Sequence, residues 1–141
     1  MTKLDYQLRA ATEADYCFCY DLTKQNVYEL FCRHFGGWVP AVFRQDFCAE
    51  ETTIIQVKKH PVGYFCLKED DEERYLSNIQ LEPTWQGRGL GSAVLKTILS
   101  TSEPKPVRLM TFTDNPAMKL YERLGFEAVE RDGETVSMVR Y

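Results

Sequence analysis

The sequence predicts an α/β fold in which a mixed sheet of about seven strands is flanked by about four helices. Segments with the two-residue alternation of β-strands lie on both sides of segments with helical periodicity. Three consecutive strand-like segments in the middle indicate an antiparallel meander, whereas helices separate the later strands, which favours a mixed sheet covered on its faces. A length of 141 residues with 44% hydrophobic residues fits a single domain over residues 1–141.

The first fifty residues contain the patterns of one strand and two helices. Residues 6–9 alternate like a short strand, and Thr12 is followed by acidic residues, as is typical of a helix N-cap. Apolar side chains then recur at separations of three, four and seven over residues 16–31. Two consecutive glycines interrupt this pattern, and a second helix is expected from about residue 40 to residue 48.

The middle of the chain has the composition of three antiparallel strands. β-branched and aromatic residues are concentrated in residues 53–58, 62–68 and 75–81. We expect His60 and Pro61 to separate the first two strands. The acidic run at 69–73 suits an exposed hairpin loop before the third.

The last third of the chain predicts a helix, a strand, a second helix and a hairpin. An apolar face with helical spacing follows a glycine-rich segment. Asn115 and Pro116 are typical of a helix start, as cap and first helical residue, and Gly125 is typical of a left-handed helix end. The last three strands are expected at 107–113, 126–131 and 135–141.

Composition excludes several classes of function. The formal net charge is −4 and the isoelectric point is near 5.2, with no dense run of Lys or Arg, so no nucleic-acid partner is expected. No apolar run approaches the ~20 residues needed to span a bilayer, and the start of the chain lacks the apolar core of a signal peptide. We therefore expect a cytoplasmic protein without a membrane partner.

The cysteines give no indication of a metal or redox site. They lie at positions 17, 19, 32, 48 and 66, an odd number whose spacings match no zinc or redox pattern. Because they stand within otherwise apolar segments, we expect reduced cysteines that act as small core residues, and no bound metal.

A glycine-rich loop lies between the last strand of the meander and the helix that follows it. Gly87, Gly89 and Gly91 alternate, which lets successive backbone N–H groups point into one concavity and leaves space for an anion. The helix N-terminus adds its positive dipole end, Arg88 adds a formal charge, and Ser92 can add a hydroxyl. A pyrophosphate is therefore the expected guest.

Other glycine-rich loops fit this segment less well. A P-loop requires a lysine before its Ser or Thr, and Gly91-Ser92 lacks it. A dinucleotide fingerprint has more widely spaced glycines and usually follows the first strand of its domain. A glycine-rich turn without a ligand, and a nucleotide-binding domain, stay open as alternatives.

Two motifs in this order resemble those of the GNAT superfamily of N-acetyltransferases. The segment Gln86-Gly87-Arg88-Gly89-Leu90-Gly91 matches in full that family's phosphate loop, Gln/Arg-x-x-Gly-x-Gly/Ala. The segment at 115–126 is similar to the family's second signature, an Asn followed by Ala, Leu-Tyr and Gly-Phe. The resemblance covers roughly residues 53–141, whereas the first fifty residues match in helical pattern only.

The resemblance implies a twisted sheet that splays between its fourth and fifth strands, where the pantetheine arm of acetyl-CoA enters. By this resemblance the backbone of Ile79 and Leu81 would pair with the arm, and Asn115 would reach it with its amide. The pyrophosphate would be held by the backbone N–H groups of Gln86, Gly87, Arg88, Gly89, Leu90, Gly91 and Ser92. Tyr121 is implied as the catalytic residue, because a phenol protonated at neutral pH can donate a proton or a hydrogen bond to the departing sulfur.

The acceptor amine and the base that takes its proton are less defined. Many family members carry a Glu on the fifth strand, but no acid stands at 109–111 here. Glu29, His34, and Ser77 acting through a water stay open as bases, and a base is unnecessary if the amine arrives neutral. Carboxylates and aromatic rings can hold an amine, so Glu29, His34 and Trp38 are also candidate acceptor contacts.

The sequence thus predicts an N-acetyltransferase that moves an acetyl group from acetyl-CoA to a primary amine by direct attack in a ternary complex. The acceptor can be a small molecule or the amine of a protein or peptide, and the enzyme a monomer or homodimer. A non-catalytic acyl-CoA-binding sensor or regulatory module is the alternative. Tyr121 favours the enzyme, whereas the missing fifth-strand acid favours the module.

Overall fold

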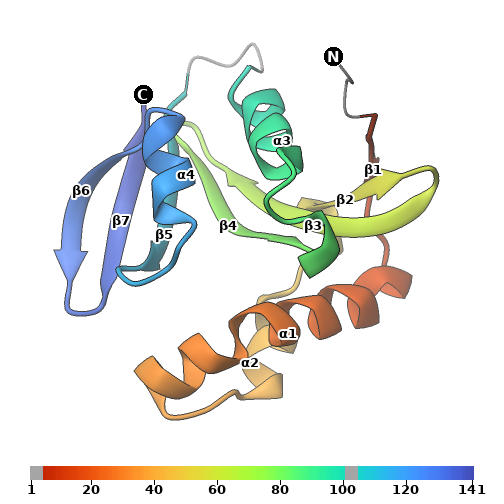
Figure 1. Cartoon of the computed structure of the whole chain (residues 1–141), viewed down its shortest axis with the longest axis horizontal. Coiled ribbons are helices and arrows are strands. Elements are labelled where there is room, and N and C mark those ends of the chain that lie inside the picture. Colours follow the sequence, from red (N-terminus) through yellow and green to blue (C-terminus); the bar gives the residue numbers. More distant parts are fainter. Residues whose placement is uncertain (1–4, 101–104) are drawn as a thin grey trace.

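The computed structural model of the chain describes residues 5–100 and 105–141. Within them the elements follow one another as β1-α1-α2-β2-β3-β4-α3-β5-α4-β6-β7, the order predicted from the sequence (Figure 1). The strands are β1 (Gln7–Ala10), β2 (Thr52–Val57), β3 (His60–Glu69), β4 (Arg74–Leu81), β5 (Val107–Phe112), β6 (Glu127–Asp132) and β7 (Thr135–Arg140). The α-helices are α1 (Tyr16–Phe35), α2 (Pro40–Asp46), α3 (Leu90–Leu99) and α4 (Met118–Arg123).

The strands form one mixed sheet in the order β1-β2-β3-β4-β5-β7-β6. Neighbouring strands run antiparallel except β4 and β5, which are parallel. Helices α3 and α4 cover one side of this sheet, and α1 and α2 lie on the other (Figure 1). The described residues therefore confirm the predicted mixed fold, with its seven strands and four α-helices.

Alternation along β2 and β3 sends neighbouring side chains into two separate cores. Ile55 and Phe65 belong to the core under α3 and α4, whereas Ile54 and Tyr64 belong to the core beneath α1. Successive side chains of a strand point to opposite faces, so each strand is apolar on both sides. The central strands are thus fixed in register by two buried faces.

The sheet opens between β4 and β5. These strands pair only where Arg74–Leu76 lies beside Val107–Leu109, although β4 continues to Leu81. The second half of β4 therefore has β3 on one side and no paired strand in the described residues on the other. We call this unpaired side of β4 the open edge.

A β-bulge lies where the pairing with β5 stops. Leu76 is opposite Leu67 and Asn78 is opposite Cys66, so Ser77 is the extra residue on β4. A bulge bends its strand and changes which face the following side chains occupy. As a result β4 leaves β5 at this point and the sheet splays, as the family resemblance implied.

The first hairpin turn is placed differently from the sequence prediction. His60 and Pro61 do not form it; Lys58 and Lys59 do, with φ of 52° and 69°, and β3 begins at His60. A two-residue turn with positive φ at both positions matches the twist of the flanking strands. The prediction was wrong because Pro61 stands near the start of β3, a position that tolerates proline.

Helix α4 also begins later than predicted. Residues 116 and 117 form a turn, and the helix starts at Met118 rather than at Pro116. Asn115 acts as expected on this turn, because its Oδ1 accepts a hydrogen bond from the N–H of Ala117 at 2.9 Å. Gly125 closes the helix with φ of 95°, as predicted.

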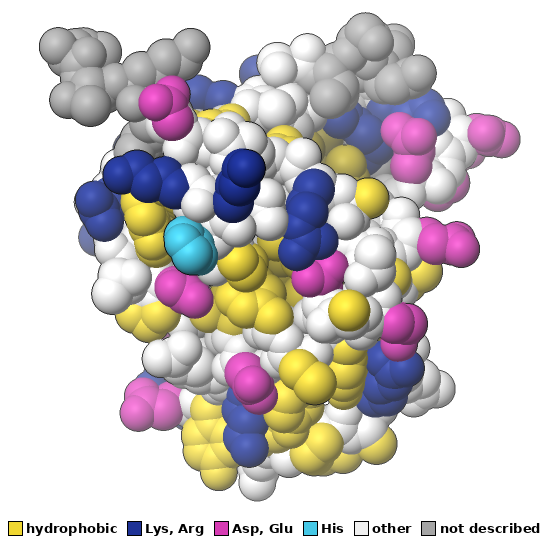
Figure 2. Space-filling view, turned by 90° about the vertical axis from the view of Figure 1, so that its right-hand side faces the viewer, with side chains coloured by type: hydrophobic (Ala, Val, Ile, Leu, Met, Phe, Trp, Pro, Cys, Tyr) yellow, Lys and Arg dark blue, Asp and Glu magenta, His cyan; other side chains and the backbone are white. Residues whose placement is uncertain are grey.

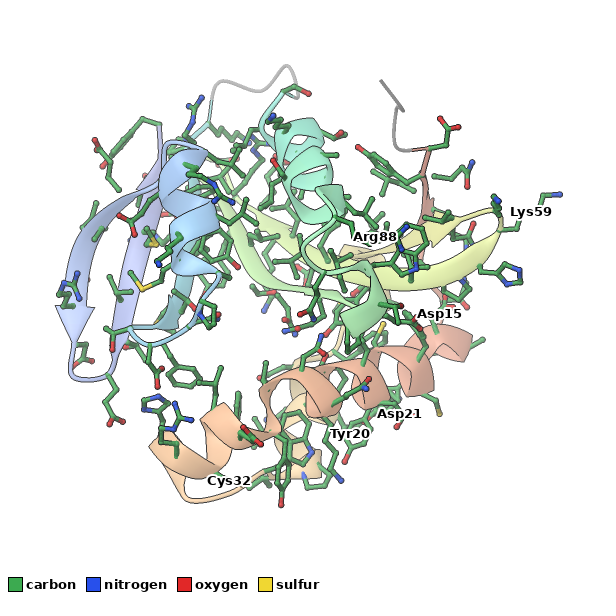
Figure 3. All side chains as sticks on the ribbon, in the orientation of Figure 1. Asp15, Tyr20, Asp21, Cys32, Lys59 and Arg88 are labelled. Carbon is green, nitrogen blue, oxygen red and sulfur yellow. The ribbon has the colours of Figure 1, made fainter. Side chains whose placement is uncertain are left out.

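The expectation that the cysteines are core residues holds only in part. All five are free, and Cys19 and Cys66 are buried, but Cys17 and Cys32 are exposed. Cys32 is labelled in Figure 3 on α1. The reason is that the buried side of α1 runs through Cys19, Leu22 and Thr23, and neither exposed cysteine lies on it.

In the described ranges, the helices are all too short or too polar to cross a bilayer. Residues 1–4 lie outside those ranges. They are part of the segment that the expectation about a signal peptide concerns.

Gly63 on β3 allows the close approach of β3 to the end of β4. A Cβ at this position would lie 2.5 Å from the carbonyl oxygen of Gln80. Because that oxygen is backbone, it cannot move aside without disturbing the strand. We expect Gly63→Ala to lower the free energy of unfolding by about 1–3 kcal/mol, measured by urea denaturation. Gly37→Ala is the control, since its Cβ would meet nothing within 4 Å; equal unfolding midpoints for the two variants would contradict this prediction.

Candidate functional site

The open edge of β4 presents backbone groups that no strand uses. The N–H of Glu82 donates to the carbonyl of Val62 at 2.8 Å, so Glu82 faces β3. Backbone groups of alternate residues point in opposite directions, and those of Ile79 and Leu81 therefore face away from β3. The Leu81 carbonyl accepts from Asn26 Nδ2 at 2.8 Å and from Gln86 Nε2 at 3.0 Å. The last carbonyl of the open edge thus already accepts hydrogen bonds from two side chains.

The glycine-rich loop after β4 has the backbone conformation that its sequence predicts. Gly87 and Gly89 have φ of 71° and 86°, in the left-handed region that favours glycine. Gly89 is the N-cap of α3, and the first intrahelical bond joins Ala93 N–H to the Gly89 carbonyl at 3.0 Å. The N–H groups before Ala93 in the first turn therefore have no helical acceptor. This is the donor set that an anion at a helix N-terminus uses.

The loop approaches the open edge closely at Gly91, which has no side chain. A Cβ on Gly91 would lie 3.4 Å from Leu81 Cδ1 and 3.8 Å from a methyl group of Leu120 on α4. Gly91 therefore sits between the end of β4 and α4, beside the opening of the sheet. The structure brings the loop, the open edge and α4 together.

The side chain of Arg88 lies over an aromatic ring. Its guanidinium stands 4.4 Å from the ring centroid of Trp85, and its Nη1 donates to the Thr84 carbonyl at 3.3 Å. Arg88 is labelled in Figure 3 on the loop before α3. The positive charge is thus held at the loop by cation–π stacking.

A shallow hollow lies on the other side of this loop. Its lining consists of Val57, Lys58, His60, Pro61, Val62, Glu82 and Trp85. None of these residues comes from β5 or α4, so the hollow is separate from the opening of the sheet. Figure 2 shows this side of the molecule, where hydrophobic side chains are bordered by Lys, Arg and acidic side chains.

The nitrogen and the oxygen of the Asn115 side-chain amide both form hydrogen bonds within the chain. Its Nδ2 donates to Thr111 Oγ1 on β5 at 2.8 Å, and its Oδ1 caps the turn before α4. The amide therefore ties the end of β5 to the start of α4, across from the open edge.

Tyr121 is buried on α4, on the same side of the sheet as α3. Its side chain is 8% exposed, and its ring packs edge-on against Phe126 at 5.9 Å between centroids. Burial raises the pKa of the Tyr121 phenol to about 12. Among the described residues no hydrogen bond of its hydroxyl is seen, and burial alone accounts for the raised pKa. A buried phenol in this state is protonated at neutral pH and has its donor free.

The side chain of His34 lies between two carboxylates. Its Nε2 is 3.0 Å from Asp114 Oδ1 and its Nδ1 is 2.7 Å from Glu134 Oε2, with the ring stacked on Phe112 at 4.3 Å. Only 5% of the side chain is exposed. This contact joins the C-terminal end of α1 to the β5–α4 loop and to the β6–β7 turn. Glu134 first, and then Asp114, raise the pKa of His34.

The raised pKa of His34 predicts a pH-dependent stability. A group whose pKa is higher in the folded state contributes fully below its unfolded pKa, about 6.5, and loses that contribution as the pH rises through the folded pKa. We expect the melting temperature of the wild type to fall above about pH 6.5, and that of His34→Gln to fall less. Thermal scans from about pH 5 to pH 9 measure this, and parallel curves for the two proteins would refute it.

Glu29 and Trp38 are not brought to the open edge by any contact in the described residues. Glu29 is exposed on α1. Trp38 packs on Phe31 at 5.3 Å and donates from Nε1 to the Tyr20 hydroxyl at 3.1 Å. Its ring belongs to the aromatic contact between α1 and α2, together with Tyr16, Tyr20, Phe31, Phe43 and Phe47.

A row of carboxamides beside the open edge was not predicted from the sequence. Asn26 on α1 donates to Gln80 Oε1 at 3.1 Å, and Gln80 Nε2 donates to Asn78 Oδ1 at 2.8 Å. Figure 3 shows side-chain nitrogen and oxygen atoms gathered between β4 and α1. We call Asn26, Asn78 and Gln80 the amide row. Its signal in the sequence was the pair of amides two residues apart on a strand, which places both on one face.

In the described residues, no three His, Cys, Asp or Glu side chains form a group that could hold a metal ion. On β5, Leu109 is buried and Met110 is 54% exposed. Besides these two, β5 carries Val107, Arg108, Thr111 and Phe112, and it has no carboxylate.

The sequence and fold match known proteins. Residues 47–128 match the family model described as "Acetyltransferase (GNAT) domain". The chain is 29% identical over 115 residues to the N-alpha-acetyltransferase RimI of Mycobacterium tuberculosis, covering 74% of this chain and 73% of that protein. It is 33% identical over 81 residues to the mouse (Mus musculus) cysteine-rich protein 2-binding protein, covering 56% of this chain but only 10% of that protein.

A solved structure with the same fold contains a ligand of interest. It is the PaiA N-acetyltransferase of Thermoplasma acidophilum in complex with coenzyme A, with a TM-score of 0.73 and 14% sequence identity. The match covers 96% of this chain and 98% of that one. At this identity the likeness concerns the fold alone.

Proposed function

The chain belongs to the acetyltransferase (GNAT) domain family, and we propose that it is an N-acetyltransferase that moves an acetyl group from acetyl-CoA to a primary amine. One observation carries the proposal. The glycine-rich loop at the start of α3 lies between the end of the open edge and α4, the helix that carries the buried phenol of Tyr121. The loop would fix the cofactor, the edge would guide its arm, and the phenol would face the reacting atoms.

The residues present fit the phosphates and arm of CoA. The left-handed glycines and the free N–H groups of the first turn suit a pyrophosphate, held by Gln86 to Ser92. The outward-facing backbone of Ile79 and Leu81 suits the amides of the pantetheine arm, as in the addition of a strand. Because the Leu81 carbonyl already accepts two side-chain donors, its N–H is the group left for the arm. Asn115 would reach the arm from the other side of the opening.

Tyr121 would act as a hydrogen-bond donor toward the sulfur. A phenol with a pKa of about 12 is a weaker acid than a thiol, whose reference pKa is about 8.5, so the phenol keeps its proton. Acetyl-CoA, when bound, supplies the acetyl group and a thiolate as leaving group. The amine nitrogen bonds to the acetyl carbon as the carbon–sulfur bond breaks with its electron pair on sulfur. The proton lost by nitrogen passes to solvent.

We propose a peptide or protein α-amine as the acceptor. The similarity to an N-alpha-acetyltransferase over 74% of the chain supports it. His34 would act indirectly, by joining the end of α1 to the β5–α4 loop and the β6–β7 turn, because carboxylates face both of its ring nitrogens. Glu29 and Trp38 would contact the acceptor at the outer part of α1 and the α1–α2 loop.

The proposal is tested by CoA release from acetyl-CoA in the presence of a free α-amine peptide, a lysine peptide with a blocked N-terminus, and spermidine. Turnover with at least one of them supports the enzyme. CoA binding without turnover on all three would instead support the alternative, a non-catalytic acyl-CoA-binding module, which the absence of a carboxylate on β5 favours.

A further inference from the structure

The amide row is part of a longer chain of hydrogen bonds with a fixed direction. Its buried end is Thr23, whose hydroxyl donates to the Cys19 carbonyl at 2.8 Å. A hydroxyl has one proton, so in the short contact between Thr23 and Tyr64 the phenol of Tyr64 is the donor. Burial raises the pKa of Tyr64, which keeps this proton in place.

This direction fixes the orientation of the Asn78 amide. Because the proton of Tyr64 is used toward Thr23, its oxygen accepts, and Asn78 Nδ2 donates to it at 2.7 Å. Asn78 Oδ1 therefore points the other way, where it accepts from Gln80 at 2.8 Å. A carbonyl oxygen has two lone pairs, so one acceptor position of Asn78 is left.

Asn78 lies where the sheet opens. It follows the bulge at Ser77, and its backbone is two residues beyond the last residue of β4 that pairs with β5. Its side chain reaches Tyr64, which belongs to the core beneath α1, whereas Tyr121 belongs to the core under α3 and α4. The two side chains thus stand on opposite faces of the sheet.

We propose that Asn78 is the positioning residue for the acceptor amine, with its free Oδ1 lone pair accepting an N–H of the incoming nitrogen. This inference depends on the proposed acetyl transfer. An amine held from the side of α1 has its own lone pair free to face the acetyl carbon, while the sulfur departs toward Tyr121. A carboxamide is not basic, so Asn78 orients the amine and takes no proton from it.

The uncharged character of the row fits this role. A carboxylate would favour the protonated form of the amine, which has no lone pair for attack. An amide accepts an N–H without stabilising that charge to the same extent. The carboxylates at the C-terminal end of α1, Asp114 and Glu134, face His34 and Arg33.

The test measures KM for the α-amine peptide and for acetyl-CoA separately. We expect Asn78→Leu to raise the peptide KM about tenfold, or to lower kcat/KM by that factor, and to leave the acetyl-CoA KM unchanged. Asn78→Asp keeps an oxygen at the same place and should recover part of the loss in the peptide KM but not in kcat, because its charge favours the protonated amine. Gln45→Leu, on the exposed side of α2, is the matched control.

A second variant changes the orientation of the Asn78 amide without removing it. Tyr64→Phe deletes the hydroxyl that fixes the Asn78 amide but keeps the buried ring. We expect a smaller rise in the peptide KM with no change in the acetyl-CoA KM, even where the melting temperature falls. A purely structural role would change both KM values or neither.

The outcomes distinguish this inference from the proposed function. Turnover of the peptide with equal KM values in wild type, Asn78→Leu and Tyr64→Phe would overturn the role of Asn78 and leave the acetyltransferase intact. CoA binding without turnover by the wild type on every acceptor would overturn both.

Discussion

Gly89→Glu is expected to weaken CoA binding by at least about 100-fold, which corresponds to about 2.7 kcal/mol. Two effects add at this position. Gly89 has φ of 86°, so any side chain strains the N-cap of α3, at a cost of about 1–2 kcal/mol. The new carboxylate would also stand among the N–H groups that receive the pyrophosphate, and like charges 4 Å apart repel by about 4 kcal/mol near a protein surface.

Titration calorimetry with CoA measures this loss, and Gly133→Glu is the matched control. Gly133 lies in the β6–β7 turn with φ of 64° and open space around its Cβ, so the backbone strain and the added charge are the same. Only the location differs. Unchanged CoA affinity in Gly89→Glu, or an equal loss in both variants, would remove the assignment of the loop as a phosphate site.

The order of elements was predictable because each signal was local. The alternation of β2 to β4, the helical spacing of α1 and the left-handed glycine at 125 depend on neighbours in the sequence. Two boundaries were missed for equally local reasons. Lysines at 58 and 59 adopt positive φ that their residue type disfavours, and the residues after Asn115 form a turn before α4 begins. At Lys58 and Lys59 the twist of the flanking strands outweighs the preference of lysine for negative φ.

The site was predictable where it depends on backbone and not where it depends on contacts between distant segments. The left-handed backbone of the glycine-rich loop follows from the spacing of its glycines. The surroundings of His34 do not, because its partners, Asp114 and Glu134, are 80 and 100 positions away along the chain. The direction of the amide row was equally hidden, since it is set by the hydroxyl of Thr23 on another element.

Tyr121→Phe is expected to lower kcat by about 100-fold or more with little change in stability. The hydroxyl is the only part removed, and hydrogen-bond donors or proton donors at the reacting atoms typically contribute 10²- to 10⁴-fold. No hydrogen bond of the hydroxyl is seen among the described residues, and the ring contact with Phe126 is kept. The melting temperature should therefore stay close to that of the wild type.

The pH dependence of this loss shows whether Tyr121 keeps its proton throughout the neutral range. With a pKa of about 12, Tyr121 stays protonated throughout the neutral range, and its donor is lost only as the pH approaches that value. The ratio of kcat between wild type and Tyr121→Phe should therefore be constant from about pH 6 to pH 9. Tyr75→Phe, which removes a phenol from the paired part of β4, is the control for the same chemical change. A ratio that falls across this range would mean that Tyr121 ionises within it, and a kcat equal to that of the wild type would exclude Tyr121 from the chemistry altogether.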